Sequence, residues 1–287
     1  MSASSDKSPR AAAAARAILT DTTLCTGCET CVRACKKDNG LGPDQPRRWQ
    51  RAIDDLSATR FTSIVRRKGG RYVRKQCRHC LEPACVSACI VGALAKTPEG
   101  PVIYDAGKCM GCRYCMVACP YGIPRYEWEK AAPVIRKCDM CYDRVLDGGE
   151  PACTANCPEK ATIFGTREEL LAEARKRLKA EPKKYKQKIF GEFQVGGTSV
   201  LYIADISLDF LGWKPELGEE SLPDKTWAAL GKVPPLVLGM GGLMAGVWWI
   251  IGRRMQMQAQ AAARARAAEA PPASADERKN TSGEQDE

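Results

Sequence analysis

Short stretches that contain apolar β-branched and aromatic residues occur in the middle of this chain, and such stretches are typical of β-strands. Two pairs of such stretches are each separated by a turn that contains glycine, an arrangement that predicts β-hairpins. The first hairpin covers residues 60–65 and 71–73 around Lys68-Gly69-Gly70, and the second covers residues 93–96 and 102–104 around Pro98-Glu99-Gly100. Short strands joined by tight turns are therefore expected in this part of the chain.

The pattern then changes from strand to helix. Residues 161–164 have the character of a strand, and Thr166 followed by Glu169 forms the signature of a helix capping box. Leucine and alanine then recur on one helical face, at Leu170, Leu171, Ala174 and Leu178. A glycine-rich strand over residues 196–203 is expected to close the globular part. We expect the helix to cover the globular part rather than to form a site.

The residues from Val233 to Gly252 carry no charge over twenty positions. At ~1.5 Å per residue a helix of this length spans about 30 Å, the thickness of the bilayer's hydrocarbon core. The alternative is a buried helix of a soluble protein. Gly242 and Gly246 lie one helical turn apart and favour close packing against another membrane helix. A transmembrane helix that docks on a membrane subunit is therefore predicted.

Charged residues on either side of this stretch indicate its orientation. The arginines that follow it are Arg253, Arg254, Arg264 and Arg266. Only Lys225 and Lys232 precede it closely. The positive-inside rule then predicts a cytoplasmic C-terminus and a globular part on the periplasmic side of a bacterial inner membrane. Residues 253–287 become alanine-rich, then polar and acidic, and are expected to be disordered.

The chain contains sixteen cysteines in 287 residues and one histidine. The cysteines form four groups: Cys25, Cys28, Cys31 and Cys35; Cys77, Cys80, Cys85 and Cys89; Cys109, Cys112, Cys115 and Cys119; and Cys138, Cys141, Cys153 and Cys157. Three cysteines on a tight loop can reach three corners of a [4Fe-4S] cluster and turn backbone N–H groups toward its sulfides. The fourth is expected at the start of a helix that leads away, where it ligates the other cluster of a pair. The repeat predicts four [4Fe-4S] clusters.

Other uses of the cysteines fit the spacing less well. Four zinc sites would normally show C-x2-C pairs separated by a longer stretch. Eight disulfides would suit a small secreted scaffold, whereas this chain is long enough to build an apolar core. Scattered structural cysteines would not repeat four times. A single histidine also excludes twin haems held by histidine pairs and a His-rich zinc enzyme.

The net charge of +10 by itself suggests a nucleic-acid partner. Sixteen thiolates would add sixteen negative charges and four oxidised cluster cores about eight positive ones, which leaves a net charge of about +2. The basic excess is therefore interpreted as compensation for buried anionic clusters, and no nucleic-acid binding is expected.

Two further features accompany the cysteine groups. His79 lies between Cys77 and Cys80, where it could replace a ligand, relay protons, or pack near a cluster and tune its potential through a ring N–H. The last of these is favoured. The first hairpin lies in an insert over residues 36–76 and is rich in Arg and Lys. We interpret it as a solvated, charge-balancing face, with docking against a partner subunit as the alternative.

The order of the four motifs and the single C-terminal span resemble the four-cluster β subunits of membrane-bound respiratory oxidoreductases, over about residues 20–252. Cys112-Arg-Tyr-Cys115-Met-Val-Ala-Cys119-Pro-Tyr and Phe164-Gly-Thr-Arg-Glu-Glu-Leu resemble the ferredoxin-type subunit of quinone-reducing nickel–iron hydrogenase. The eleven-residue gap before Cys153 and Gly196-Gly-Thr-x-Val resemble the periplasmic formate dehydrogenase β subunit. Without a visible signal peptide or twin-arginine pair, export on a signal-bearing partner is expected.

The resemblance implies a pairing of motifs that spacing alone leaves open. Motif one pairs with motif four, and motif two with motif three. The implied ligand sets are Cys25, Cys28, Cys31 and Cys157 for cluster 1; Cys138, Cys141, Cys153 and Cys35 for cluster 2; Cys77, Cys80, Cys85 and Cys119 for cluster 3; and Cys109, Cys112, Cys115 and Cys89 for cluster 4.

The expected fold is α+β, with two pseudo-symmetric ferredoxin-like two-cluster lobes, a β-hairpin insert and one C-terminal transmembrane helix. The predicted domains are a flexible arm over residues 1–17, a four-cluster domain over 18–205, a connector over 206–232, a transmembrane helix over 233–252 and a disordered cytoplasmic tail over 253–287.

The chain shows no nucleophile–base constellation, phosphate loop or haem pair, so we expect a non-catalytic subunit. The resemblance implies electron transfer from a catalytic subunit, hydrogenase or formate dehydrogenase, through four [4Fe-4S] clusters to a membrane cytochrome or quinone-reactive subunit. The expected partners are those two subunits and membrane lipid. The alternatives are an iron–sulfur redox-sensing or structural membrane protein, or a catalytic subunit in its own right.

Overall fold

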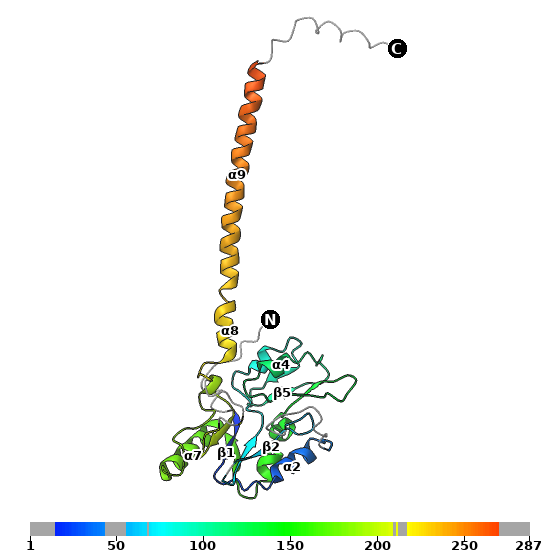
Figure 1. Ribbon diagram of the computed structural model, residues 1–287, viewed down its shortest axis with the longest axis vertical. Coiled ribbons are helices and arrows are strands. Elements are labelled where there is room, and N and C mark those ends of the chain that lie inside the picture. The colour runs from blue at the N-terminus through cyan, green and yellow to red at the C-terminus, as the bar shows by residue number, and fades with distance from the viewer. Residues whose placement is uncertain (1–14, 44–55, 68, 209–210, 212–216, 270–287) are drawn as a thin grey trace. The chain divides into compact units, whose positions relative to one another are not determined.

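The computed structural model describes residues 15–43, 56–67, 69–208, 211 and 217–269. The chain divides into two compact units, residues 1–227 and 228–287. Helices and strands are mixed throughout the first unit (Figure 1). The expected combination of helices and strands is therefore confirmed.

A three-stranded sheet organises the first unit. Its strand order is β8 (Thr162–Thr166), β1 (Arg16–Asp21) and β9 (Val200–Ile203). The central strand β1 runs antiparallel to β8 and parallel to β9. Because side chains alternate along a strand, Leu19 packs on one face of the sheet with Leu201, while Ile18 packs on the other with Val200 and the cysteine region. The sheet is thus buried on both faces.

Helix α7 (Arg167–Ala180) covers the face of the sheet that is turned away from the cysteines, and Figure 1 shows it beside β1. The predicted capping box is present: the Glu169 N–H donates to Thr166 Oγ1 (3.3 Å), and the Thr166 N–H donates to Glu169 Oε2 (3.0 Å). The four predicted apolar positions of this helix are buried. Both the helix and its covering role are confirmed.

Three two-stranded ribbons complete the strand content of the described residues. They are β2 (Ser63–Arg67) with β3 (Arg71–Lys75), β4 (Leu94–Lys96) with β5 (Val102–Tyr104), and β6 (Arg125–Tyr126) with β7 (Ile135–Arg136). The first two are the predicted hairpins. The predicted solvated face of the first hairpin is wrong in part, because Arg66 and Arg71 are exposed whereas Arg74 and Lys75 are buried. Their long side chains point to the interior, where anionic groups are expected.

Each cysteine motif carries a short helix. These are α2 (Thr30–Asp38), α3 (Ala84–Ser87), α4 (Tyr114–Ala118) and, in the fourth motif, α5 (Tyr142–Leu146) and α6 (Ala152–Ala155). Helix α2 packs against α6, and α3 packs against α4. Motif one therefore lies against motif four, and motif two lies against motif three.

Two strands begin at residues other than those predicted from the sequence. The predicted flexible arm over residues 1–17 lies mostly outside the described residues, but β1 already begins at Arg16 and Ala17 is fully buried. The strand expected from Gly196 begins only at Val200, because Gln194–Gly196 forms a 3-10 turn and Gly197 has a φ of 88°. The start of β1 follows from its pairing with β8, and the start of β9 follows from its pairing with β1.

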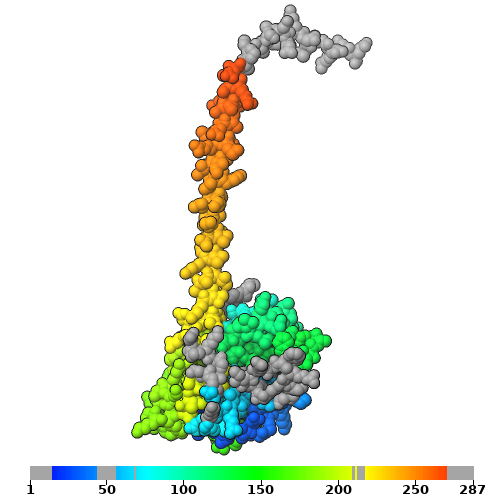
Figure 2. All heavy atoms as spheres, viewed as in Figure 1, coloured from blue at the N-terminus to red at the C-terminus, as the bar shows by residue number. Residues whose placement is uncertain are grey.

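Helix α8 (Leu222–Leu230) lies in the predicted connector and crosses the boundary between the units. Helix α9 (Val233–Glu269) contains the predicted span and makes up most of the described part of the second unit. Within Leu222–Glu269 the chain is long and apolar enough to cross a membrane, and no side chain of α9 is buried. Figure 2 shows these side chains projecting along the helix. The expected disorder after residue 252 is wrong as far as Glu269, since the helix continues to that residue.

Candidate metal centre

The four C-x2-C loops share one backbone feature. The residue immediately before the second cysteine has a positive φ in every motif: Gly27 (75°), His79 (46°), Gly111 (72°) and Met140 (66°). A left-handed residue at this place reverses the chain, which brings both cysteines and the intervening N–H groups to one side. Glycine adopts this conformation without strain, whereas His79 and Met140 do so at a cost that the surrounding structure must offset.

The fourth cysteines are not placed as predicted. We expected each at the start of a helix leading away, but the helix begins near the third cysteine and the fourth comes one turn later. Cys31 and Cys35 both lie in α2, and Cys119 is the residue that ends α4. Third and fourth cysteines are four positions apart in every motif. Cys89 and Cys157 follow the ends of α3 and α6, so Cys35 is the one fourth cysteine that lies within its helix.

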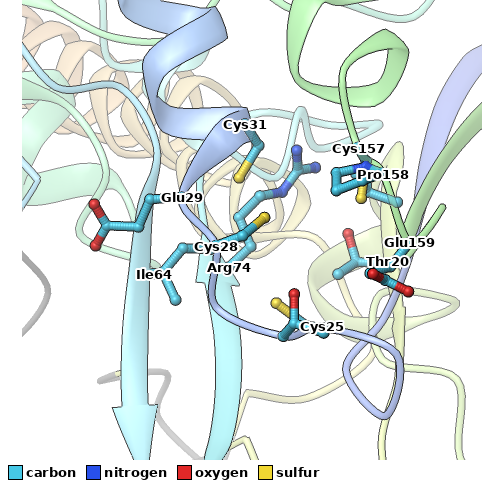
Figure 3. A pocket seen from close by; sticks show the side chains of 13 residues that line it. Thr20, Cys25, Cys28, Glu29, Cys31, Ile64, Arg74, Cys157, Pro158 and Glu159 are labelled. Carbon is cyan, nitrogen blue, oxygen red and sulfur yellow. The ribbon is translucent and has the colours of Figure 1, made fainter.

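The structure brings Cys157 of motif four to the first three cysteines of motif one. Burial raises the pKa of the Cys25 thiol, and the neighbouring thiols of Cys157 and Cys28 raise it further. Burial raises the pKa of Cys31 to about 11, with contributions from the thiols of Cys153, Cys25 and Cys157. All four thiols line one cavity (Figure 3). We call them the first thiol set.

A second thiol set combines Cys35 of motif one with three cysteines of motif four. Burial raises the pKa of Cys35 far above its ordinary value, and the thiols of Cys153 and Cys141 add to the effect. Desolvation likewise raises the pKa of Cys138, and the thiols of Cys35, Cys77 and Cys141 raise it further. Burial raises the pKa of Cys141 to about 12. The fourth cysteine of motif one therefore lies with the first three of motif four, and the fourth cysteine of motif four lies with the first three of motif one.

Motifs two and three exchange theirs in the same way. The third thiol set surrounds Cys80, whose pKa is raised by burial and by the thiols of Cys119, Cys77 and Cys85. The fourth thiol set surrounds Cys115, whose pKa is raised to about 11 by burial and by the thiols of Cys109, Cys89 and Cys112. All sixteen predicted cysteines thus fall into four sets of four.

The four sets form a single row, because thiols of successive sets also face one another. The pairs that do so are Cys31 with Cys153, Cys138 with Cys77, and Cys85 with Cys115. In the described parts of the chain no three His, Cys, Asp or Glu side chains converge tightly enough for a single metal ion. Four thiols in each set match in number the four cysteines that hold a [4Fe-4S] cluster.

Buried cations surround the row, and the sequence did not identify them as part of the site. Arg74 lines the cavity of the first thiol set, and Figure 3 shows its guanidinium among the labelled thiols. Arg78 is 2% exposed and lies between the rings of Tyr121 (5.4 Å) and Tyr202 (4.4 Å). Its charge lowers the pKa of Cys80 against the effect of burial.

Two lysines flank the third thiol set. Lys137 Nζ donates to the carbonyl of Cys138 (2.7 Å), and its charge lowers the pKa of the Cys85 thiol against the effect of burial. Burial lowers the pKa of Lys96 to about 8, and the thiols of Cys80 and Cys77 work in the opposite direction. No hydrophobicity pattern marks a buried lysine. The excess of basic residues is the one sequence signal that anticipated such groups.

His79 is fully enclosed, at 1% exposure. Its Nδ1 accepts a hydrogen bond from the Val102 N–H (2.9 Å), so the proton of the neutral ring is on Nε2. Burial lowers the pKa of His79 well below its ordinary value, and Lys137 and Lys96 lower it further. The packed position fits the favoured prediction, and donation from its ring to a cluster stays a prediction.

Comparisons with known proteins agree with the cysteine pattern. The sequence profile of the family described as "4Fe-4S dicluster domain" matches residues 69–167, a stretch that contains motifs two, three and four. The chain is 38% identical over 234 residues to the Hydrogenase-2 operon protein HybA of Escherichia coli O157:H7, a match that covers 68% of this chain and 71% of the relative.

Two further relatives differ in how much of the chain they match. A protein of Nitratidesulfovibrio vulgaris is 38% identical over 252 residues, which cover 83% of this chain and 67% of the relative. The probable anaerobic dimethyl sulfoxide reductase subunit YnfG of Escherichia coli strain K12 is 40% identical over 159 residues, which cover 52% of this chain and 73% of the relative. This chain is similar to each of these proteins over most of the relative's length.

Proposed function

Because this chain belongs to the family of iron–sulfur electron-transfer subunits of respiratory oxidoreductases, we propose that it carries electrons between a catalytic subunit and a membrane cytochrome or quinone-reactive subunit through four [4Fe-4S] clusters. The observation that carries the proposal is the division of sixteen thiols into four sets that form one row. A row of four sites suits conduction better than sensing, for which one exposed site suffices.

The residues fit the proposed cofactor. Each set offers four thiols, and the left-handed loops turn backbone N–H groups to the same side as the cysteines. The buried guanidinium of Arg74 lacks an oxygen partner and lies where an anionic group is expected. When bound, a [4Fe-4S] cluster supplies reversible one-electron chemistry.

The proposed ligands follow the four sets. They are Cys25, Cys28, Cys31 and Cys157; Cys138, Cys141, Cys153 and Cys35; Cys77, Cys80, Cys85 and Cys119; and Cys109, Cys112, Cys115 and Cys89. The packing of α2 on α6 and of α3 on α4 supports the two pairings and the proposed arrangement as two lobes. The chain's own work is to hold these thiols, surround them with N–H groups and cations, and exclude water.

We propose that α9 anchors the chain in the inner membrane. Its length and apolar character support a span, and the absence of buried side chains leaves its surface available to lipid or to a membrane subunit. The arginines at positions 253 and 254 favour a cytoplasmic C-terminus, and hence a periplasmic four-cluster domain.

For the catalytic partner we propose a hydrogenase. The match to the Hydrogenase-2 operon protein covers 68% of this chain, against 52% for the dimethyl sulfoxide reductase subunit YnfG. Formate dehydrogenase is the second candidate, favoured by the eleven-residue gap before Cys153.

The test is anaerobic purification of the full complex from membranes. Iron and acid-labile sulfide should reach about sixteen of each per chain, and the clusters should be reduced by hydrogen and reoxidised by a quinone analogue. Reduction by formate instead would replace the proposed partner while keeping the conduit.

Two results would overturn the proposal itself. One is zinc, or no metal, in the purified protein. The other is a full complement of clusters that exchange no electrons with either the catalytic substrate or the quinone, as a sensor or structural protein would show.

A further inference from the structure

Arg74 is a charged residue that the family pattern of cysteines does not include. It lies on β3, opposite Ile64 of β2, and is 2% exposed. Its carbonyl oxygen accepts a hydrogen bond from the Tyr202 hydroxyl (2.8 Å), which ties β3 to the central sheet. The backbone of Arg74 is therefore fixed both by the hairpin and by the central sheet.

The guanidinium lacks the partner that a buried cation needs. Within the described residues its Nε, Nη1 and Nη2 make no hydrogen bond to an oxygen or nitrogen atom. A buried, uncompensated charge costs several kcal/mol, so such a residue is retained only opposite a negative group. Burial lowers the pKa of Arg74, yet the thiols of Cys153 and Cys31 raise it above its ordinary value.

Those two cysteines belong to different sets. Cys31 is in the first thiol set and Cys153 in the second. Arg74 also lowers the pKa of Cys25 and of Cys35, one thiol of each set, against the larger effect of burial. One cation therefore faces two thiols of the first set and two of the second.

Resting on the function proposed above, we propose that Arg74 is a shared positioning charge that raises the reduction potentials of both clusters held by the first and second thiol sets. Each reduction adds one electron, delivered by the catalytic partner, and hence one negative charge to a cluster. A fixed cation beside the cluster stabilises that added charge, so the reduced form becomes easier to reach. The third and fourth sets, whose thiols are not among those that Arg74 faces, are outside its influence.

The experiment is a redox titration of the purified complex, followed by electron paramagnetic resonance, with wild type, Arg74→Gln and Arg74→Lys. The matched control is Arg33→Gln, since Arg33 is an exposed arginine of α2, the helix that carries Cys31. Arg74→Gln should lower two of four midpoint potentials and leave two unchanged. Arg74→Lys, which keeps the charge, should lower the same two by less, and Arg33→Gln should move none.

Other results overturn the inference. They are equal shifts of all four potentials, no shift in Arg74→Gln, or equal shifts in Arg74→Gln and Arg74→Lys. If Arg74→Gln fails to assemble clusters, the inference expects loss of about half of the iron, from two sets only. Loss of all iron, with Arg74→Lys at wild-type potentials throughout, would show a general folding role. A wild-type complex without clusters refutes the proposed function instead, so the two failures are distinguishable.

Discussion

The first and fourth thiol sets, at opposite ends of the row, have the same loop and different surroundings. Gly27 and Gly111 occupy the same place in C-x2-C-x2-C loops, with φ values of 75° and 72°. The charge that faces the first set is Arg74, which lowers the pKa of Cys25 and Cys31 against burial. At Cys109 of the fourth set, hydrogen bonds from the Ile135 backbone and the Tyr104 side chain lower the thiol pKa overall, and the carboxylate of Glu127 makes a smaller contribution in the opposite direction.

The motif therefore determines where the thiols lie, whereas the neighbouring charged side chains determine the electrostatic environment of each set. Added negative charge is stabilised beside Arg74 and opposed beside Glu127, so the potential at the first set should lie above that at the fourth. Glu127 is 9% exposed, so solvent screens it little, and its ion pair with Lys130 Nζ (2.8 Å) offsets part of its charge. Four kinds of variant test this difference between the two ends of the row.

The largest effect is expected from removing one ligand at each end of the row. Cys157→Ala should abolish the cluster of the first set although the residue belongs to motif four, and Cys89→Ala should abolish that of the fourth set although it belongs to motif two. Each variant should lose about a quarter of the iron. Metal analysis and the remaining resonance signals measure this. If Cys157→Ala removed the cluster held by Cys138 and Cys141, the exchange of fourth cysteines would be wrong.

The next largest difference between the two ends is expected in the stability lost when Gly27 or Gly111 is replaced by alanine. A Cβ at Gly111 would lie 2.7 Å from the carbonyl oxygen of Pro133, whereas at Gly27 it would meet the ring of Tyr72 at 2.6 Å or less. A side chain can move aside more readily than a backbone carbonyl. Gly111→Ala should therefore cost about 2–4 kcal/mol of unfolding free energy and Gly27→Ala less.

Gly122→Ala is the control for this pair, because Gly122 has a φ of 60° and no atom within 4 Å of a built Cβ. It should cost about 1 kcal/mol, from backbone strain alone. Thermal unfolding of the three variants gives the order. A Gly122→Ala variant as unstable as Gly111→Ala would mean that backbone strain, not the Pro133 contact, governs the loop.

Neutralising Glu127 should reduce the difference in midpoint potential between the first and fourth sets. Glu127→Gln removes a negative charge beside the fourth set and should raise its midpoint potential by on the order of tens of millivolts, leaving the first set unchanged. Glu129→Gln, an exposed neighbour, serves as the control and should have no effect. Potentiometric titration of the complex measures both. A fall in potential, or an equal change in Glu129→Gln, would contradict the assigned role.

The smallest effect is expected where neither end is touched. Thr166→Ala removes the capping box of α7 and should lower the unfolding free energy by about 1 kcal/mol. All four potentials should stay at their wild-type values, because α7 covers the face of the sheet away from the cysteines. Unfolding curves and redox titrations together check this. A shift in any potential would show that the two faces of the sheet are coupled.

Local chemistry made much of the fold predictable. Hairpins follow from glycine turns, and the start of α7 follows from Thr166 and Glu169. The start of β1 at Arg16 was not predictable, since residues 11–16 consist of alanine and arginine and have no strand pattern of their own. Long-range pairing with β8 and β9 decides that strand.

The site divides in the same manner. Regular spacing identified all sixteen cysteines, because each loop must present its thiols within a few residues. Spacing could not choose the partner of each fourth cysteine, since that depends on which helices pack. The burial of Arg74 was not predicted for a related reason. An arginine in a basic hairpin is expected to be solvated, and only the tertiary fold shows that it is enclosed.

The place of β1 between β8 and β9 has a consequence for biosynthesis. Its neighbours are the last strands of the first unit, so the nascent N-terminal segment has no sheet to join until almost the whole unit has left the ribosome. Cys157, which lies beside Cys25, is also synthesised only shortly before β8. Maturation should therefore be late and all-or-none, and a truncated fragment ending before β8 should not load iron at motif one.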